Sequence, residues 1–238
     1  GSAKTPVGAG LALHALVVDG GSGAQIYTAA VTEKQAKLAY VDAEAMVKKS
    51  PELRARVTIT TNNLAVLSTG AFLRPVSSEA RSLDGKRVHF ACVDELHEHP
   101  TSEVVDKIRA GTKGRKNALI FEPTNSGYNR TSVCWQHHEY SRQILQDTIT
   151  NDAWFAYVCT LDACDACYAA GHMQPNPECL QCDRWDVEGD HWLKAQPMLG
   201  VSVSREYVRE QVEEAKGMPT KQAIVRRLNF CEWTSARV

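Results

Sequence analysis

The sequence has no long hydrophobic run, and this absence excludes the simplest kind of membrane protein. A helix needs about 20 predominantly apolar residues to cross a bilayer. One apolar stretch, residues 11–18, is interrupted by His14 and closed by Asp19. The first ten residues also lack the basic region and apolar core of a signal peptide. We therefore expect a cytoplasmic protein without a membrane partner.

Neither sign of charge is in excess. The 238 residues include 27 lysines and arginines and 28 aspartates and glutamates, which gives a formal net charge of −1. This composition is that of an ordinary globular protein. It does not exclude nucleic acid as a partner, because a basic patch can be hidden in a balanced total. The length predicts one large domain, or one domain with an insertion.

The eight cysteines are unevenly distributed. Four of them form two C-x-x-C pairs separated by eleven residues, and these are Cys164, Cys167, Cys179 and Cys182. Without an export signal, such a group indicates a metal site rather than disulfides. Two C-x-x-C knuckles can converge on a tetrahedral site, so we predict structural Zn²⁺, with an iron–sulfur cluster as the alternative. Four thiolates leave no open position for catalysis. The other four cysteines are interpreted as small core residues.

Strand-like and helical stretches alternate along the chain, which predicts an α/β domain. Thr32 and Gln35 form a capping box that starts one helix, and Pro51 ends it. The expected strands cover residues 24–29, 57–60, 64–67, 72–76, 88–93, 118–121 and 154–161. The other expected helices cover residues 7–18, 102–110, 131–146, 190–194, 204–216 and 220–228. We predict a three-layer domain with a mainly parallel sheet over residues 1–162, a zinc-knuckle insertion over 163–186 and a helical subdomain over 187–238.

Residues 87–100 contain the first candidate for chemistry. The apolar run 88–93 is typical of a strand that is buried on both faces of a parallel sheet, and it ends in Asp94 and Glu95. Open α/β sheets bind their ligands at the carboxyl ends of such strands. In nucleotide hydrolases, one acid there supports Mg²⁺ and another residue orients the attacking water. A strand followed by a solvated acidic turn would give the same pattern.

The first residues supply a phosphate-binding partner for these acids. Residues 1–5, Gly-Ser-Ala-Lys-Thr, match the last part of the loop G-x-x-x-x-G-K-[ST], with Ala3 in place of the final glycine. In this loop the helix N-terminus and the lysine hold phosphate, and the hydroxyl ligates Mg²⁺. The sequence therefore predicts a site for ATP and Mg²⁺ that is formed by Lys4 and Thr5 together with Asp94 and Glu95. A lysine at a helix start also occurs without any ligand.

A third polar group follows the expected strand at residues 118–121. Thr124, Asn125 and Ser126 would face the terminal phosphate from this strand and sense its presence. A plain turn is the alternative, because these residue types also favour turns. The histidines in this part of the chain and beyond are interpreted as structural or surface residues: His97, His99, His137, His138 and His191.

In this order, the motifs resemble the ATPase domain of the large terminase subunit of tailed bacteriophages and related prophages. The resemblance covers nearly the whole chain outside the cysteine segment. The segments that carry it are Ala3-Lys4-Thr5, residues 26–30 with Gln35-Ala36, residues 78–85, 93–99, 124–128, 192–195, Pro197, 199–202 and 226–230.

The resemblance implies a P-loop fold of the RecA/ASCE type that couples ATP hydrolysis to the movement of double-stranded DNA into a capsid. It implies that Lys4 and Thr5 bind phosphates and Mg²⁺, that Asp94 supports Mg²⁺ and that Glu95 acts on the attacking water. Coupling would fall to Thr124, Asn125 and Ser126.

An arginine finger is also implied by the resemblance, and Arg81 is the candidate. The implied partners are double-stranded DNA, the portal protein, the small terminase subunit and further copies in a ring, all in the host cytoplasm. The family's adenine-reading segment and nuclease domain have no counterpart, so we expect a motor part truncated at both ends. The alternatives are another helicase-like P-loop ATPase, or a non-catalytic zinc-binding fragment that binds DNA or a partner.

Overall fold

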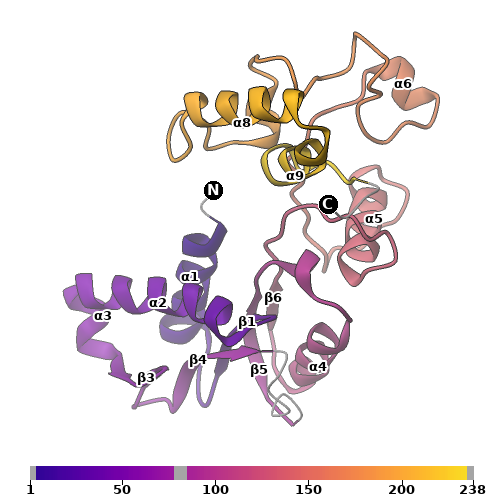
Figure 1. Ribbon diagram of the computed structural model, residues 1–238. Helices are drawn as coiled ribbons and strands as arrows, with labels where there is room; N and C mark the ends of the chain where they lie inside the picture. Colours follow the sequence, from indigo (N-terminus) through magenta and orange to yellow (C-terminus); the bar gives the residue numbers. More distant parts are fainter. Residues whose placement is uncertain (1–3, 78–84, 235–238) are drawn as a thin grey trace. The chain divides into compact units, whose positions relative to one another are not determined.

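The computed structural model describes residues 4–77 and 85–234. The chain forms two compact units, one from Lys4 to Thr124 and one that holds the described residues from Asn125 onward (Figure 1). This division falls within the predicted domain of residues 1–162, so the predicted domain boundaries stay a proposal.

The first unit is built on a six-stranded sheet with the order β2-β3-β4-β1-β5-β6. The strands are β1 (Gln25–Ala30), β2 (Thr58–Thr60), β3 (Asn63–Val66), β4 (Ala71–Ser77), β5 (Val88–Val93) and β6 (Leu119–Phe121). Strand β1 lies parallel to both β4 and β5, and β5 lies parallel to β6. Strands β2 and β3 are antiparallel to their neighbours. The sheet is therefore mixed and mostly parallel, as predicted.

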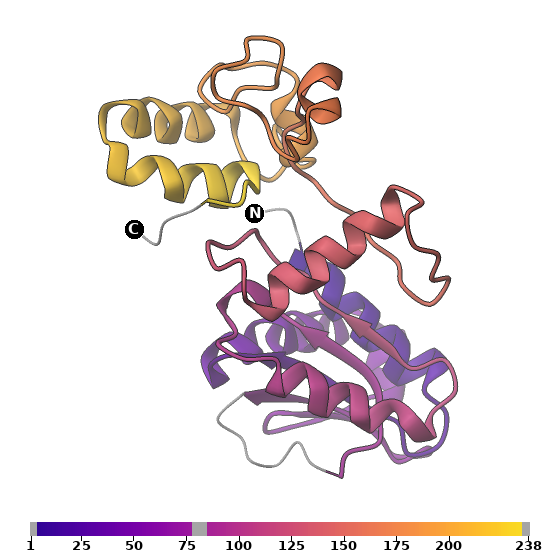
Figure 2. The same cartoon turned by 90° about the vertical axis from the view of Figure 1, so that its right-hand side faces the viewer.

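Helices cover both faces of this sheet. They are α1 (Lys4–His14), continued by the π-helical turn Ala15–Asp19, then α2 (Glu33–Lys49), α3 (Pro51–Arg56) and α4 (Glu103–Gly111). Helices α1 and α2 lie on one face and α4 on the other (Figure 2). Every residue of β5 is buried, as expected for a strand covered on both sides. The predicted three-layer architecture is confirmed.

Helix α2 shows how the sequence determines these elements. The Thr32 side chain accepts a hydrogen bond from the Gln35 N–H, and the Gln35 side chain bonds back to the Thr32 backbone, so the predicted capping box is present. The residues expected at helical spacing are all buried against the sheet, namely Ala36, Ala39, Tyr40, Ala43 and Val47. Pro51 follows as the first residue of α3.

Helix α1 approaches β5 closely at Gly8. A Cβ atom added to Gly8 would lie 2.7 Å from Cys92 Sγ, which is closer than side chains pack. Cys92 is fully buried, and this burial raises the pKa of its thiol to about 12. Glycine is therefore required at this position by packing, although glycine weakens a helix interior.

We expect Gly8→Ala to lower the free energy of unfolding by about 1–3 kcal/mol, because the added methyl group overpacks the contact with Cys92. Gly10 lies in the same helix, and no atom lies within 4 Å of its added Cβ. Gly10→Ala should therefore stabilise the protein by up to about 1 kcal/mol through helix propensity. Urea unfolding of both variants checks this, and equal effects would contradict the close contact. Adding Cys92→Ala to Gly8→Ala removes the sulfur atom that the new methyl group meets, and should restore stability.

The second unit is helical. Its helices are α5 (Val133–Leu145), α6 (Asp165–Ala169), α7 (Trp192–Ala195), α8 (Arg205–Gly217) and α9 (Pro219–Phe230). The core packs around Trp192 and Phe230, whose ring centroids are 5.4 Å apart. Apolar residues of α8 and α9 surround them, including Val208, Val212 and Val225. The helices predicted over residues 131–146, 190–194, 204–216 and 220–228 are confirmed, with shifts of a few residues at their ends.

One strand prediction is wrong, and the burial expected for another strand needs correction. Residues 154–161 form no strand in the described part of the chain. Phe155 is 89% and Tyr157 76% exposed, whereas Leu161, the last residue of the run, is buried in the core of the second unit. An apolar run predicts a strand only where another strand can pair with it. The run 118–121 does form β6, but Leu119 is 49% exposed because β6 lies at the end of the described sheet.

Candidate active site and cysteine cluster

Asp94 and Glu95 lie directly after β5, at the carboxyl edge of the parallel strands. The Asp94 N–H donates to the Ala29 carbonyl at 2.8 Å, near the end of β1. The Glu95 N–H donates to the Pro123 carbonyl at 3.0 Å, just beyond β6. The turn is thus fastened to the ends of both neighbouring strands, at the edge where α/β sheets bind ligands.

Glu95 has an unusual backbone conformation. Its φ of 50° and ψ of 53° are left-handed, a region that non-glycine residues seldom adopt. Its N–H also donates to Asp94 Oδ1 at 3.0 Å, so the two acids are tied together. Such conformations cost on the order of 1 kcal/mol and are concentrated at functional sites.

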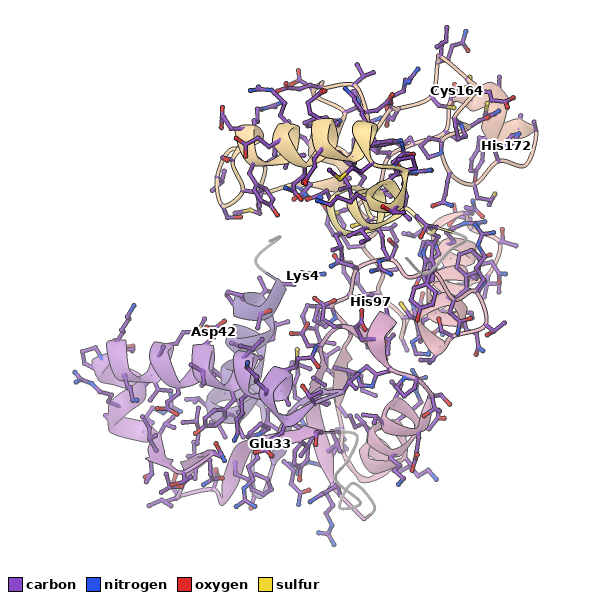
Figure 3. The ribbon with its side chains drawn as sticks, in the orientation of Figure 1. Lys4, Glu33, Asp42, His97, Cys164 and His172 are labelled. Atoms are coloured by element: carbon purple, nitrogen blue, oxygen red, sulfur yellow. The ribbon has the colours of Figure 1, made fainter. Side chains whose placement is uncertain are left out.

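Lys4 and Thr5 reach these acids from the first turn of α1. Thr5 Oγ1 donates to Asp94 Oδ2 at 3.4 Å, and Lys4 Nζ lies 3.9 Å from Glu95 Oε1. The Lys4 and Glu95 side chains are 24% and 32% exposed, so the group is accessible from solvent. Figure 3 shows Lys4 at the start of α1 and His97 at the same end of the unit. The structure brings together the four residues that the sequence predicted as one site.

The charges of this group favour a cation. Burial raises the pKa of Asp94 and the adjacent Glu95 carboxylate raises it further, whereas the Glu95 N–H, Lys4 and Thr5 lower it. The pKa stays above its ordinary value, because one lysine does not compensate two neighbouring acids in a partly buried position. Carboxylate and hydroxyl oxygens are the ligands that Mg²⁺ prefers, so the donor set fits this ion.

His97 belongs to the site, although the sequence analysis interpreted it as a structural or surface residue. Its side chain is only 4% exposed, and Nδ1 lies 3.1 Å from Glu95 Oε2 and 3.1 Å from Thr124 Oγ1. Its backbone N–H donates to the same Thr124 hydroxyl at 3.0 Å, and Nε2 lies 2.9 Å from Glu98 Oε1. His97 therefore connects the acid after β5 to the threonine after β6. Its position two residues after Glu95 was the signal available in the sequence.

The three predicted coupling residues are divided between the two units. Thr124 contacts His97 in the first unit. Ser126 belongs to the second unit, is buried, and donates to the Glu232 carbonyl at 2.8 Å and the Arg227 carbonyl at 3.3 Å. The Asn125 carbonyl lies 4.0 Å from Cys134 Sγ. The candidate arginine finger, Arg81, lies outside the described residues.

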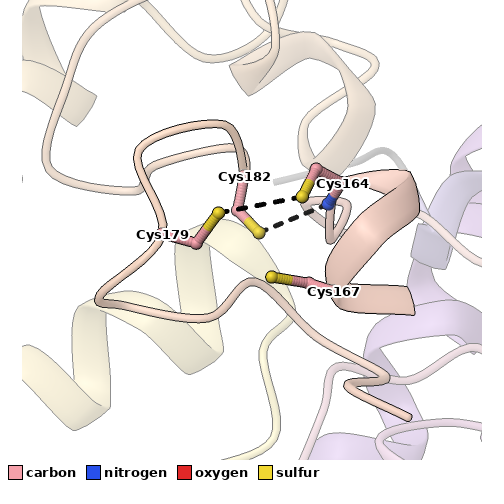
Figure 4. A group of neighbouring side chains, drawn as sticks. All are labelled: Cys164, Cys167, Cys179 and Cys182. Carbon is pink, nitrogen blue, oxygen red and sulfur yellow. Dashed lines mark hydrogen bonds between the residues drawn. The ribbon is translucent and has the colours of Figure 1, made fainter. Parts of the chain in front are cut away.

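The four cysteines of the predicted zinc knuckle come together in the second unit (Figure 4). Their sulfur atoms all lie within 4.8 Å of one another, and Cys164 Sγ is 3.7 Å from Cys179 Sγ. A tetrahedral zinc–thiolate site, with Zn–S bonds of about 2.3 Å, has sulfur atoms about 3.8 Å apart. The arrangement is compatible with a metal ion.

The surroundings of the sulfur atoms also suit a metal. The Gln181 N–H is the main cause that lowers the pKa of Cys179, to about 7, and the Cys164 N–H donates to Cys182 Sγ at 3.3 Å. Loss of hydration and the neighbouring thiols raise the pKa of Cys167 to about 12. A cation would therefore be needed to keep all four groups as thiolates.

The fold and the site together define a class. A mostly parallel sheet between two layers of helices, with a Lys-Thr helix start beside an Asp-Glu strand end, is the arrangement of a P-loop nucleotide-binding domain. The family model described as "Terminase large subunit, ATPase domain" matches residues 1–143, and the chain belongs to this family.

Individual relatives agree with this assignment. The crystal structure of the HK97 bacteriophage large terminase has a TM-score of 0.77 at 22% identity, over 98% of this chain and 44% of that one. A mutant of the Thermus phage P74-26 large terminase ATPase domain has a TM-score of 0.59 at 18% identity, over 98% of this chain and 85% of that one. These structures share the fold.

A curated relative, Protein YmfN of Escherichia coli (strain K12), is 28% identical over 163 residues. That match covers 66% of this chain and 30% of the relative. The chain thus spans less than half of the HK97 protein and of YmfN. Within the described residues, none of the helices has the length and apolar character that a bilayer crossing requires.

Proposed function

We propose that this chain is the ATP-hydrolysing part of a DNA-packaging terminase and that it couples hydrolysis to the movement of double-stranded DNA into a capsid. The observation that carries this proposal is the group formed by Lys4, Thr5, Asp94 and Glu95. Membership of the terminase family supports the substrate and the reaction. In this proposal the portal protein, the small terminase subunit and further copies of the chain are the partners, and the host cytoplasm is the location.

In the proposed mechanism, each residue of the group has one role. Lys4 contacts the β- and γ-phosphates from the N-terminus of α1. Thr5 and Asp94, whose side chains share a hydrogen bond, would hold Mg²⁺, which neutralises charge on the phosphates when bound. Glu95 orients the water that attacks the γ-phosphate. Its left-handed backbone and its contact with His97 limit the directions in which the carboxylate can point.

His97 and Thr124 extend this site toward the coupling residues. A change in the position of Glu95 on hydrolysis would alter the hydrogen bonding of Thr124, because His97 Nδ1 contacts both side chains. Asn125 and Ser126 follow directly in the chain, and Ser126 holds the end of α9 through two carbonyl groups. We assign coupling to these residues and the arginine finger to Arg81.

The test is Mg²⁺-dependent release of phosphate from ATP and its loss when Glu95 is replaced. A helicase-like ATPase would show the same dependence on Glu95, but its turnover would accompany strand separation rather than movement along an intact duplex. A chain that binds DNA through its cysteine segment without ATP turnover would support the non-catalytic alternative.

We further propose that the four-cysteine group binds structural Zn²⁺. Of residues 163–181, none is buried, so this stretch has no apolar core of its own. Small segments of this kind are commonly held by a metal instead. The sulfur separations and the N–H groups aimed at the sulfurs support zinc as the ion.

Protein purified without chelator is expected to contain about one zinc ion per chain. Cys182→Ser should remove most of it, because Cys182 is the buried ligand of the group. Cys159→Ser serves as the matched control, since Cys159 lies outside the group, and it should leave the metal content unchanged. Elemental analysis makes the measurement. A metal content near zero would contradict the zinc site, and iron with visible absorption would favour the cluster alternative.

A further inference from the structure

The loop between the two cysteine pairs, residues 168–178, holds a distant part of the chain through Gln174. Gln174 Nε2 donates to the Trp233 carbonyl at 3.1 Å, and the Trp233 N–H donates to Gln174 Oε1 at 2.5 Å. One side-chain amide thus satisfies both backbone groups of a single residue, as a neighbouring strand would. The two residues are 59 positions apart in the sequence.

Trp233 is a central residue of this region. It is 6% exposed, and its ring lies 4.7 Å from that of Trp135 and 5.5 Å from that of His138, both on α5. The pKa of His138 is lowered to about 4, chiefly by burial, so its ring is uncharged at neutral pH. Gln174 therefore fixes a backbone whose side chain packs against α5.

The residues beside Trp233 are held from a second direction. The Glu232 carbonyl accepts the hydrogen bond of Ser126, and the Thr234 N–H donates to the Gly127 carbonyl at 3.4 Å. The segment 231–234, which follows α9, is thus fastened by residues 126–127 and by Gln174. The coupling serine and the loop between the cysteine pairs act on the same four residues.

The loop has little else to keep Gln174 in place. Tyr168 and Met173 are 48% and 42% exposed, and none of residues 168–178 is buried. The hydrogen bonds of this loop other than those of Gln174 lie toward its two ends. The His172 N–H donates to the Cys167 carbonyl at 2.9 Å and the Tyr168 hydroxyl contacts Gln146 Nε2, while the Glu178 N–H donates to Asn176 Oδ1 at 3.1 Å. The cysteine pairs stand at both ends of the loop, so joining them through one ion shortens the loop and limits where Gln174 can lie.

We infer that metal binding by the four cysteines closes Gln174 onto Trp233, so that the cysteine group acts as a metal-dependent clamp on the segment 231–234. This inference rests on the metal binding proposed above and adds a role for it. Loss of the metal opens the clamp, and the Trp233 N–H loses its hydrogen-bond acceptor, while the segment keeps its contacts with residues 126–127 and Arg226 and the packing of Trp233 on α5. The clamp makes the order of this segment depend on the state of the thiols.

Hydrogen–deuterium exchange of the whole protein tests the clamp at the Trp233 amide. Removing the metal from the unaltered protein with a chelator should speed exchange of both residues 168–178 and Trp233, the latter about tenfold or more. Gln174→Ala should speed exchange at Trp233 to a similar degree while residues 168–178 stay protected and the metal content stays unchanged. Gln181→Ala, an exposed glutamine in the second knuckle, is the control and should change neither region.

The other outcomes would overturn either the clamp alone or both the clamp and the zinc site. If the chelator speeds exchange in residues 168–178 but leaves Trp233 unchanged, the clamp is wrong and the zinc site stands. The same conclusion follows if Gln174→Ala keeps its metal and protects Trp233 as before. If the protein holds no metal and added Zn²⁺ changes neither region, both the zinc site and the clamp are wrong.

Discussion

Replacing Glu95 by glutamine is expected to slow Mg²⁺-dependent ATP hydrolysis by about 10²–10⁴-fold, with nucleotide affinity nearly unchanged. Glutamine has the same shape but cannot take up negative charge or accept a proton from the attacking water. The hydrogen bond between Thr5 and Asp94 does not involve the Glu95 carboxylate, and neither does the phosphate contact proposed for Lys4. Phosphate release and binding of a fluorescent ATP analogue, on the longest form of the protein that the gene encodes, make the measurement.

Glu98 offers a matched control for this experiment. It contacts the same imidazole, since Glu98 Oε1 lies 2.9 Å from His97 Nε2, and its side chain is 50% exposed. Glu98→Gln removes one carboxylate that contacts His97 and leaves Glu95 in place. We expect turnover within about threefold of the unaltered protein. Equal turnover in the two variants would sink the role assigned to Glu95.

Replacing Arg226 by methionine should lower the free energy of unfolding of the second unit by about 3–5 kcal/mol. Glu232 is 1% exposed, and its Oε2 accepts hydrogen bonds from Arg226 Nε at 2.9 Å and Nη2 at 2.6 Å. Methionine keeps much of the apolar stem but leaves a buried carboxylate without its cation. The cost arises from the uncompensated charge.

The deficit of this variant should depend on pH. Burial raises the pKa of Glu232 above its ordinary value of 4.5, although Arg226 opposes the shift. The folded state therefore binds the proton more tightly than the unfolded state, and the resulting stability is present at low pH and lost as pH rises through the folded pKa. Without Arg226 the folded pKa rises further, so Arg226→Met should lose most stability near pH 7 and less toward pH 4.5.

Urea unfolding at both pH values measures this dependence. Adding Glu232→Gln to Arg226→Met removes the titrating group, so the double variant should lose the extra sensitivity to pH. A deficit that is the same at both pH values in Arg226→Met would show that lost packing, rather than the buried charge, is responsible.

The fold could be predicted where burial follows a local pattern. The continuous apolar run of β5 and the capped, regularly spaced α2 contain enough information within themselves to be identified. The run at 154–161 has an equally strong pattern but forms no strand, because pairing depends on another strand and not on the run itself. Residue pattern predicts which segments can form a strand, whereas the partner decides whether they do.

The candidate site could also be predicted where its residues belong to short local motifs. Lys4, Thr5, Asp94 and Glu95 belong to short motifs whose spacing and neighbours are informative, and their side chains lie together in the structure. His97 was missed because a histidine beside a motif has no distinctive periodicity. The contact between Gln174 and Trp233 had no local signal, because a glutamine in a polar loop can face any direction until the chain is folded.

The tight contact between Gly8 and Cys92 also determines the positions of the site residues relative to one another. From Gly8, one helical turn of about 6 Å leads back to Lys4, and from Cys92, two strand residues of about 6.6 Å lead forward to Asp94. The two distances lead toward the same edge of the sheet and are nearly equal. The contact between Gly8 and Cys92 therefore determines how the start of α1 is aligned with the end of β5. A shift of α1 along β5 would change the separation of Lys4 and Glu95 by the same amount. Gly8 thus sets the distance between Lys4 and Glu95.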